Sequence, residues 1–186
     1  MARTLVTGAT GFIGVRLVER LVARGDRVAC LVRPTSDTGG LEPLGVERAV
    51  GSLGDAESLV RAVGGSFGGE GAEVVLHVAG LTHAWRAEDF HRVNAEGTAT
   101  LCRAAAGASS PPTVVLLSSL AAAGPSPDGA PHTEATKPAP ISHYGRSKLA
   151  GERAARRFAD RLPLSIVRPP VVFGPGDRDG LLLFKA

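Results

Sequence analysis

A tyrosine and a lysine lie four residues apart in the segment Tyr144-Gly145-Arg146-Ser147-Lys148, and Tyr144 is the only tyrosine of the chain. At the start of a helix, this spacing places both side chains on one face. A phenol, with an ordinary pKa of about 10, exchanges protons poorly at neutral pH, but a neighbouring ammonium favours the phenolate and lowers that pKa. The pair is therefore a candidate acid–base site for a substrate oxygen. The spacing alone is also compatible with a tyrosine and a lysine that lie on an exposed surface and have no catalytic role.

A glycine-rich loop near the N-terminus forms the second candidate site. It runs Thr7-Gly8-Ala9-Thr10-Gly11-Phe12-Ile13-Gly14, between an apolar segment typical of a strand and a periodic segment typical of a helix. Glycines there allow a tight turn and let the backbone approach a pyrophosphate, whose charge faces the N–H groups of the helix N-terminus. We expect a dinucleotide at this loop, and a plain tight turn is the alternative. The residues expected to bind it are Gly8, Thr10, Gly11, Phe12, Ile13 and Gly14.

The end of the second expected strand bears on which dinucleotide binds. In an NAD site, an acidic residue about 20 positions beyond the glycine loop holds the ribose 2′-hydroxyl. Here the strand ends in Cys30-Leu31-Val32-Arg33-Pro34, without an acid. The planar guanidinium of Arg33 can instead pair with the 2′-phosphate of NADP. We therefore expect NADP as the preferred cofactor and NAD as the second candidate, with a plain surface arginine as the alternative.

The elements that must position these residues alternate along the chain. Short strands that are apolar on both faces, separated by helices, are typical of right-handed crossovers and a parallel sheet covered on both sides. We expect an α/β fold, a doubly wound parallel sheet of the Rossmann type, as one domain over residues 1–186. The expected strands are residues 3–7, 28–32, 46–50, 73–79, 113–118 and 164–168, and the expected helices cover about 13–22, 56–63, 87–107 and 143–161.

Two segments are expected to be loops. Residues 64–71, with the sequence GGSFGGEG, are predicted to form a mobile surface loop without chemistry. Residues 121–142 are rich in proline, alanine and glycine and show no periodic pattern. A loop of that length inside a compact domain is usually functional or disordered.

The composition argues against several classes of protein. The formal net charge is +3 and the arginines are interspersed with acids, as in Glu152-Arg153, so no basic stripe is present for nucleic acid. No signal peptide is recognisable, and no apolar run reaches the roughly 18 residues of a membrane helix. We expect a cytoplasmic protein with a small-molecule substrate, without a nucleic-acid or membrane partner and without a metal site. Cys30 and Cys102 are expected to be core thiols in a reducing compartment.

Taken together, these motifs resemble the extended short-chain dehydrogenase/reductase superfamily, in its NAD-dependent epimerase/dehydratase branch. The resemblance covers essentially all 186 residues. Besides the glycine loop and the Tyr144–Lys148 pair, the motifs that carry it are His77-Val78-Ala79-Gly80, Asn94-Ala95-Glu96-Gly97-Thr98, Ser118-Ser119, and Arg168-Pro169-Pro170 leading to Gly174-Pro175-Gly176.

The resemblance implies a role for each candidate residue. Tyr144 would be the acid–base residue, and Lys148 would also bind the nicotinamide ribose. Ser119, preferred to Ser118 for its distance from Gly124, would hydrogen-bond the reacting oxygen. The residues implied to complete the site are Asn94, which would position the Lys148 side through water, and Val78, Ala79, Gly80 and Pro169, which would border the cofactor.

Three departures from the family pattern narrow the activity. Ser52-Leu53 stands where the family often has Asp-Leu to meet the adenine, although serine can still hydrogen-bond. Leu120-Ala121 stands where sugar-nucleotide dehydratases carry an Asp-Glu pair, so that elimination lacks its acid and base. Ala122-Ala123-Gly124 replaces the Val-Tyr-Gly ending common in epimerases. The chain therefore resembles the hydroxysteroid-dehydrogenase-like and dihydroflavonol-reductase-like members most.

Three functions stay open at this point. The first is reduction of a ketone or oxidation of an alcohol with NAD(P) at a Ser-Tyr-Lys site. The second is epimerisation of a nucleotide sugar, and the third is a dinucleotide-binding module or inactive fragment without turnover. A homodimer is also expected, through the helices near 87–107 and 143–161, because such helices commonly pair in this family.

The resemblance further implies a smaller C-terminal domain that shapes the substrate pocket. It is expected after residue 186, so that it is absent or truncated in this sequence. We therefore expect the 186-residue chain to bind dinucleotide but to show no appreciable catalysis alone. The apolar end Leu181–Phe184 would lack its usual covering.

Overall fold

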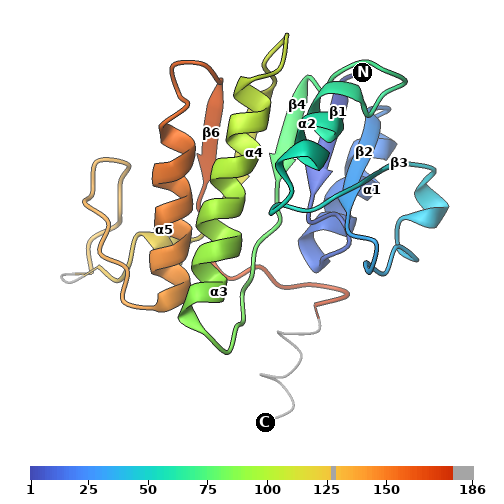
Figure 1. Cartoon of the computed structure of the whole chain (residues 1–186). Helices are drawn as coiled ribbons and strands as arrows, with labels where there is room; N and C mark the ends of the chain where they lie inside the picture. The colour runs from blue at the N-terminus through green and yellow to red at the C-terminus, as the bar shows by residue number, and fades with distance from the viewer. Residues whose placement is uncertain (127–128, 178–186) are drawn as a thin grey trace.

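A six-stranded parallel sheet forms the centre of the computed structural model, which describes residues 1–126 and 129–177 (Figure 1). The strand order is β3-β2-β1-β4-β5-β6, which confirms the expected doubly wound α/β fold. The six expected strands are all present, with ends shifted by at most two residues. The expected apolar end Leu181–Phe184 lies outside the described residues. The strands are β1 (Arg3–Thr7), β2 (Arg27–Val32), β3 (Glu47–Val50), β4 (Val74–His77), β5 (Thr113–Leu117) and β6 (Leu164–Val167).

Helices cover the two faces of the sheet and enclose two apolar clusters. Alternate side chains of a strand point to opposite faces, so the neighbours Leu5 and Val6 of β1 belong to different clusters. Val6 packs under α1 (Phe12–Ala23), whereas Leu5 packs under the opposite layer. That layer consists of α2 (Ala56–Gly65), α4 (Gly97–Ala106) and α5 (His143–Arg156) (Figure 1). None of the helices in the described ranges has the length and apolarity that a membrane span requires.

Short helical segments complete the chain. Two 3₁₀ turns, η1 (Glu42–Leu44) and η3 (Leu120–Ala122), follow β2 and β5. Asp55 caps α2, and its carboxylate accepts hydrogen bonds from the N–H groups of Glu57 and Ser58. Both cysteines are buried, as expected for core thiols.

The connection between β4 and β5 differs from the single helix expected over 87–107. It consists of α3 (Ala87–His91), a π-helical segment η2 (Arg92–Glu96) and α4, which follow one another without a break. A π segment holds one residue more per hydrogen-bonded turn than an α-helix and is frequently found at functional sites. Asn94, a candidate site residue, lies at its centre.

The segment 64–71 is not the plain surface loop that its glycines suggested. α2 continues to Gly65, and the next residues form a tight turn closed by a bridge between Phe67 and Glu70. Phe67 is only 1% exposed and belongs to the same cluster as Leu5. The prediction is wrong at this residue, because one aromatic side chain among the glycines anchors the turn in the core.

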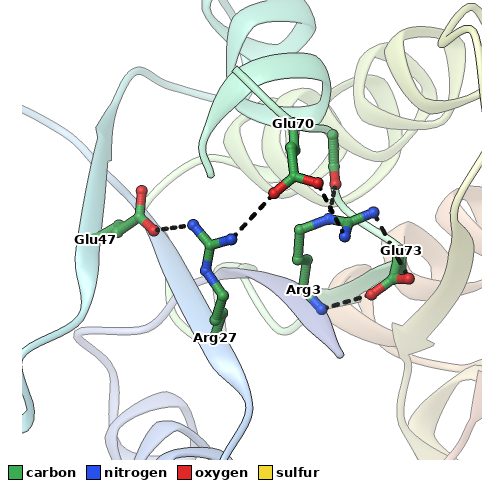
Figure 2. Close-up of polar contacts among 6 residues, drawn as sticks. Arg3, Arg27, Glu47, Glu70 and Glu73 are labelled. Atoms are coloured by element: carbon green, nitrogen blue, oxygen red, sulfur yellow. Dashed lines mark hydrogen bonds and ion pairs between the residues drawn. The ribbon is translucent and has the colours of Figure 1, made fainter. Parts of the chain in front are cut away.

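Ion pairs join the amino ends of the strands, at the sheet edge opposite the glycine loop (Figure 2). Arg27 binds Glu47 at 3.3 Å and Glu70 at 3.1 Å, and its guanidinium lies 5.5 Å from the centre of the Phe67 ring. Arg3 binds Glu70 and Glu73. The network therefore ties the Phe67 turn to the sheet.

Replacing Arg27 by alanine is expected to lower the free energy of unfolding by only about 1 kcal/mol. Its side chain is 49% exposed, and exposed ion pairs contribute about 0.2–1 kcal/mol each, with a similar amount for a cation over an aromatic ring. Urea denaturation measures the loss, which should shrink in about 1 M salt as the ion pairs are screened. A loss above about 3 kcal/mol would indicate that the network behaves as a buried one.

Candidate active site

The carboxyl ends of the parallel strands bring the candidate residues to one edge of the sheet. β1 and β4 are neighbours, and the chain leaves them toward opposite sides of the sheet, which creates the switch point where ligands bind in this architecture. The glycine loop follows β1, Val78 to Gly80 follow β4, Ser118 and Ser119 follow β5, and Pro169 follows β6. Residues distant in sequence thus meet here.

The glycine loop packs too closely for side chains at two positions. Gly8 has a φ of +72°, and a Cβ on it would lie 2.6 Å from the backbone nitrogen of Ala79. A Cβ on Gly14 would lie 2.8 Å from Ala9 Cα and would overlap the carbonyl oxygen of Gly8. The backbone of the loop is therefore held against both α1 and the end of β4.

The N-terminus of α1 fits an anionic ligand. The helix begins after Gly11, without a capping side chain and without an acidic residue in its first turn. Its first N–H groups consequently have no side-chain acceptor, and the helix dipole places positive potential at this end. Backbone N–H groups with room for a close approach suit a pyrophosphate, so the residues present fit a dinucleotide.

A row of buried polar groups connects the end of β1 to the end of β4. Thr7 Oγ1 lies 2.7 Å from His77 Nδ1 and accepts a hydrogen bond from the N–H of Ala79 at 3.3 Å. On the other side, His77 Nε2 lies 3.0 Å from Thr98 Oγ1, which donates to the carbonyl of Asn94 at 2.7 Å. Burial, with a contribution from the charge of Lys148, lowers the pKa of His77 to about 3, so its ring is neutral.

Asn94 uses its whole amide to fasten the loop after β4 to α5. Its Oδ1 accepts from the N–H of Leu81 at 2.8 Å, and its Nδ2 donates to the Leu81 carbonyl at 3.0 Å and to Ser147 Oγ at 2.9 Å. The backbone of Gly151 meets the Asn94 carbonyl so closely that a Cβ there would overlap it. Asn94 therefore holds the framework around Lys148.

Lys148 reaches the centre of this edge with little exposure to water. It is 7% exposed, and its Nζ donates to the carbonyl oxygen of Leu117 at 2.6 Å. A Cβ on Gly80 would lie 3.0 Å from Asn94 Oδ1 and 3.5 Å from Lys148 Nζ, so the three expected neighbours do meet. Burial lowers the pKa of Lys148 to about 8, and the charge of Glu152 acts in the opposite direction.

Tyr144 lies beside Ser119, and its pKa differs from the sequence-based expectation. Burial raises the pKa of the phenol above its ordinary value, and a hydrogen bond with the Ser119 side chain acts in the opposite direction. The expected lowering by Lys148 is therefore not observed, because the ammonium is turned onto the Leu117 carbonyl instead. The edge of the Phe90 ring packs on Tyr144, with centroids 6.1 Å apart.

The two serines after β5 have different surroundings. Ser119 is half-buried, and its Oγ accepts from the N–H of Ala121 at 3.1 Å. Ser118 is buried, and its hydroxyl donates to Glu152 at 2.6 Å. Ser118 is thus committed to a buried carboxylate, which favours Ser119 as the candidate for a substrate oxygen.

Glu152 and Arg168 form a buried ion pair that sequence reasoning missed. Glu152 is 1% exposed and accepts two hydrogen bonds from the Arg168 guanidinium, at 2.7 and 2.6 Å. In the sequence, Glu152 stands out only as an acid next to Arg153, with no place in the expected site. A signal was present, since Tyr144, Lys148 and Glu152 follow one another at intervals of four residues.

The remaining candidate residues lie around this centre. The Pro169 carbonyl accepts from the N–H of Leu120 at 3.0 Å, next to Ser119. Leu53 packs against Gly97, where a Cβ would lie 2.9 Å from it, and Ser52 is half-buried beside it. Arg33 is exposed at the end of β2, farther along the same edge.

Comparison with known proteins identifies the family. The model of the NAD dependent epimerase/dehydratase family matches residues 4–183. The chain belongs to this family. Proteins similar to this chain carry the enzymatic names of reductases, dehydrogenases and epimerases.

Within the epimerase/dehydratase family, relatives of different activity resemble this chain. A ceramide reductase of Caulobacter vibrioides is 41% identical, over 97% of this chain and 49% of the relative. Sterol demethylase protein B of Methylococcus capsulatus is 37% identical, over 94% of this chain and 52% of the relative. The solved structure of MoeE5 in complex with UDP-glucose and NAD superposes with a TM-score of 0.79 at 31% identity, and covers 98% of this chain and 59% of that one. The chain thus spans about half the length of the curated relatives it matches.

Proposed function

We propose that this chain is the dinucleotide-binding part of an oxidoreductase that reduces a ketone, or oxidises the corresponding alcohol, with a nicotinamide cofactor. The observation that carries the proposal is the meeting of Ser119, Tyr144 and Lys148 at the carboxyl edge of the sheet, next to the glycine loop and Gly80. The relative named ceramide reductase supports the same reaction type.

Each residue of the proposed site would have a separate task. The nicotinamide, when bound, supplies or accepts a hydride. Tyr144 is protonated at neutral pH, as an ordinary phenol is, and burial raises its pKa further; it would donate its proton to the carbonyl oxygen during reduction. Ser119 would hydrogen-bond the same oxygen, and Lys148 would bind the cofactor ribose once it leaves the Leu117 carbonyl. Asn94 would keep Lys148 and the loop at Leu81 in register.

An activity screen distinguishes the proposed reaction from epimerisation, the second function that the family name supports. A ketone reductase consumes NAD(P)H in proportion to product, whereas an epimerase returns its cofactor to the starting state after each turnover. NADPH and NADH oxidation by the full-length protein should therefore be measured against a panel of ketones, with nucleotide sugars as the comparison. Interconversion of nucleotide sugars without net cofactor oxidation would contradict the proposal.

A preference for NADP over NAD is part of the proposal and depends on Arg33. The exposed guanidinium stands where an acid would otherwise repel the 2′-phosphate. A charge-assisted contact of about 1.5–3 kcal/mol corresponds to roughly 10- to 100-fold tighter binding of NADPH. Isothermal titration of both cofactors against the parent protein and Arg33→Asp measures it. Equal affinities in the parent protein, or an unchanged ratio in the variant, would contradict the preference.

The expected substrate, location, further domain and dimer stay predictions. A small-molecule substrate, a cytoplasmic location and a substrate domain beyond this chain belong to the proposed activity. The homodimer was expected to form through the helices that include α4 and α5. On α5, Arg146, Arg153 and Arg156 are exposed. Among the described residues, no large exposed apolar side chain lies on α3, α4 or α5. A dimer through these helices would have to pack small and charged side chains.

A further inference from the structure

Lys148 and Glu152 lie one turn apart on α5, and each holds a different residue at the end of β5. Lys148 Nζ donates to the Leu117 carbonyl at 2.6 Å, and Glu152 Oε1 accepts from Ser118 Oγ at 2.6 Å. The next residue of the strand end is Ser119, which hydrogen-bonds Tyr144 one turn earlier on the same helix. Three successive turns of α5 thus each contact one of three consecutive residues, Leu117 at the end of β5 and the two serines that follow it.

Glu152 is also held from its other side by Arg168, which follows β6. Arg168 Nε donates to Oε1 at 2.7 Å and Nη2 donates to Oε2 at 2.6 Å. The Glu152 side chain is 1% exposed and that of Arg168 is 22% exposed. A bidentate pair of this kind fixes the direction of the carboxylate, and its burial reduces screening by solvent. The proposed reaction gives this carboxylate no task of its own.

We propose that Glu152 is a positioning residue of the candidate active site, which fixes α5 against the end of β5 and keeps the buried Lys148 positively charged. The inference rests on the proposed function, in which Lys148 binds the ribose of the cofactor. Burial lowers the pKa of Lys148 to about 8 with Glu152 present, so a further tenfold increase of its acid dissociation constant would leave at least about half of the amines neutral at pH 7 to 8. The charge of Glu152 opposes this lowering of the pKa.

Few other charged groups face Lys148. His77 of β4 is buried and neutral, and Arg168 reaches the site only through its pair with Glu152. Tyr144 on α5 is protonated at neutral pH. Cys102 of α4 is buried, and burial raises the pKa of its thiol, so it is neutral. The remaining charged groups on α5 and the elements packed against it point toward solvent or lie near the surface: Glu88, Asp89, His91, Arg92, Glu96, Arg103, His143, Arg146, Arg153 and Arg156. Glu152 is therefore the negative charge that acts on Lys148.

The titration of Lys148 itself tests the proposal. The chain has three lysines, Lys137, Lys148 and Lys185, so NMR of ¹³C-labelled lysine side chains can follow each amine, with Lys148→Arg used for assignment. In Glu152→Gln the acid dissociation constant of Lys148 should increase at least about tenfold, so its pKa falls. In Arg168→Gln the carboxylate loses its counter-charge, and the pKa of Lys148 should rise. Ser118→Ala, which keeps both charges, should change the constant less than about threefold.

Opposite shifts distinguish this role from a structural one. If Glu152 only held the fold together, both charge variants would loosen α5, admit water to Lys148 and raise its pKa in the same direction. A rise or no change in Glu152→Gln would therefore overturn the proposal. If that variant does not fold, Glu152→Asp replaces it. We then expect a smaller fall of the Lys148 pKa, because the aspartate carboxylate lies one methylene farther from the amine. An unchanged or raised pKa of Lys148 in this variant would also overturn the proposal.

The measurement separates this inference from the proposed function, because it needs neither cofactor nor turnover. An inactive protein whose Lys148 titration shifts as expected would contradict only the proposed reaction. An active reductase whose Lys148 does not respond to Glu152 would contradict only the positioning role.

Discussion

A Tyr144→Phe variant is expected to lose at least about 100-fold in kcat with a good ketone substrate while binding the dinucleotide as tightly as the parent protein. The change removes one hydroxyl and keeps the ring that packs against Phe90. General acid–base assistance contributes about 10²–10⁴-fold to a rate, so its loss should be at least of that size. Steady-state kinetics of the full-length protein, with calorimetry of NADPH binding, measures both quantities.

Ser118→Ala is a matched control for this variant. It also removes a single hydroxyl after β5, but one that is committed to Glu152 and not to the candidate oxygen site. We expect its kcat to stay within about tenfold of the parent value. Loss of an acid–base group should lower kcat by more than that, at least about 100-fold. A loss below tenfold in Tyr144→Phe would contradict the acid–base assignment, and equal losses in both variants would indicate a general disturbance of the site.

Gly14→Val is expected to weaken dinucleotide binding by more than about 100-fold. A Cβ at this position would overlap the Gly8 carbonyl and lie 2.8 Å from Ala9 Cα, so α1 and the loop must move apart. Overpacking of this kind costs about 1–3 kcal/mol, and the upper end, appropriate to a branched side chain against backbone, corresponds to about 150-fold in affinity. Titration with NADPH measures the loss, and circular dichroism establishes that the variant is folded.

Gly11→Ala provides the comparison within the same loop. Gly11 has a φ of −81°, which any residue can adopt, and a Cβ there would lie 3.4 Å from the Gly8 carbonyl, close to ordinary contact. We expect its affinity to stay within a few-fold of the parent protein, since a tight contact of this kind costs well under about 1 kcal/mol. A folded Gly14→Val that binds within tenfold of the parent would show that the loop does not carry the cofactor.

The sequence predicted the sheet well because its central strands β1 and β2 are buried on both faces. In β2, residues 28–32 form a continuous apolar run, a signal that does not depend on distant contacts. The candidate residues after the strands came from the family resemblance, and the fold brings them together because parallel strands end at one edge. The structure brings Gly80, Asn94 and Lys148 together, as that resemblance implied.

What escaped prediction depends on contacts between distant segments. The π segment differs from an α-helix only in which carbonyl each N–H reaches, and residues 92–96 carry no pattern that distinguishes the two. The partner of Glu152 is 16 residues away, beyond β6, whereas its neighbour in sequence is Arg153. The pKa of Tyr144 depends on burial and on where Lys148 points, and neither is written in their spacing.

The polar row through His77 has only one possible arrangement of its hydrogens. Thr98 spends its hydroxyl hydrogen on the Asn94 carbonyl, so toward the ring it can only accept, and Nε2 must carry the hydrogen of the neutral imidazole. Nδ1 then accepts from the Thr7 hydroxyl, whose oxygen accepts from Ala79. All four hydrogens point the same way, from the loop after β4 toward the π segment. The row is thus a one-way polarised chain, in which no single bond can reverse without leaving two hydrogens facing each other, and it couples the loop beside Gly80 to Asn94 with one fixed direction.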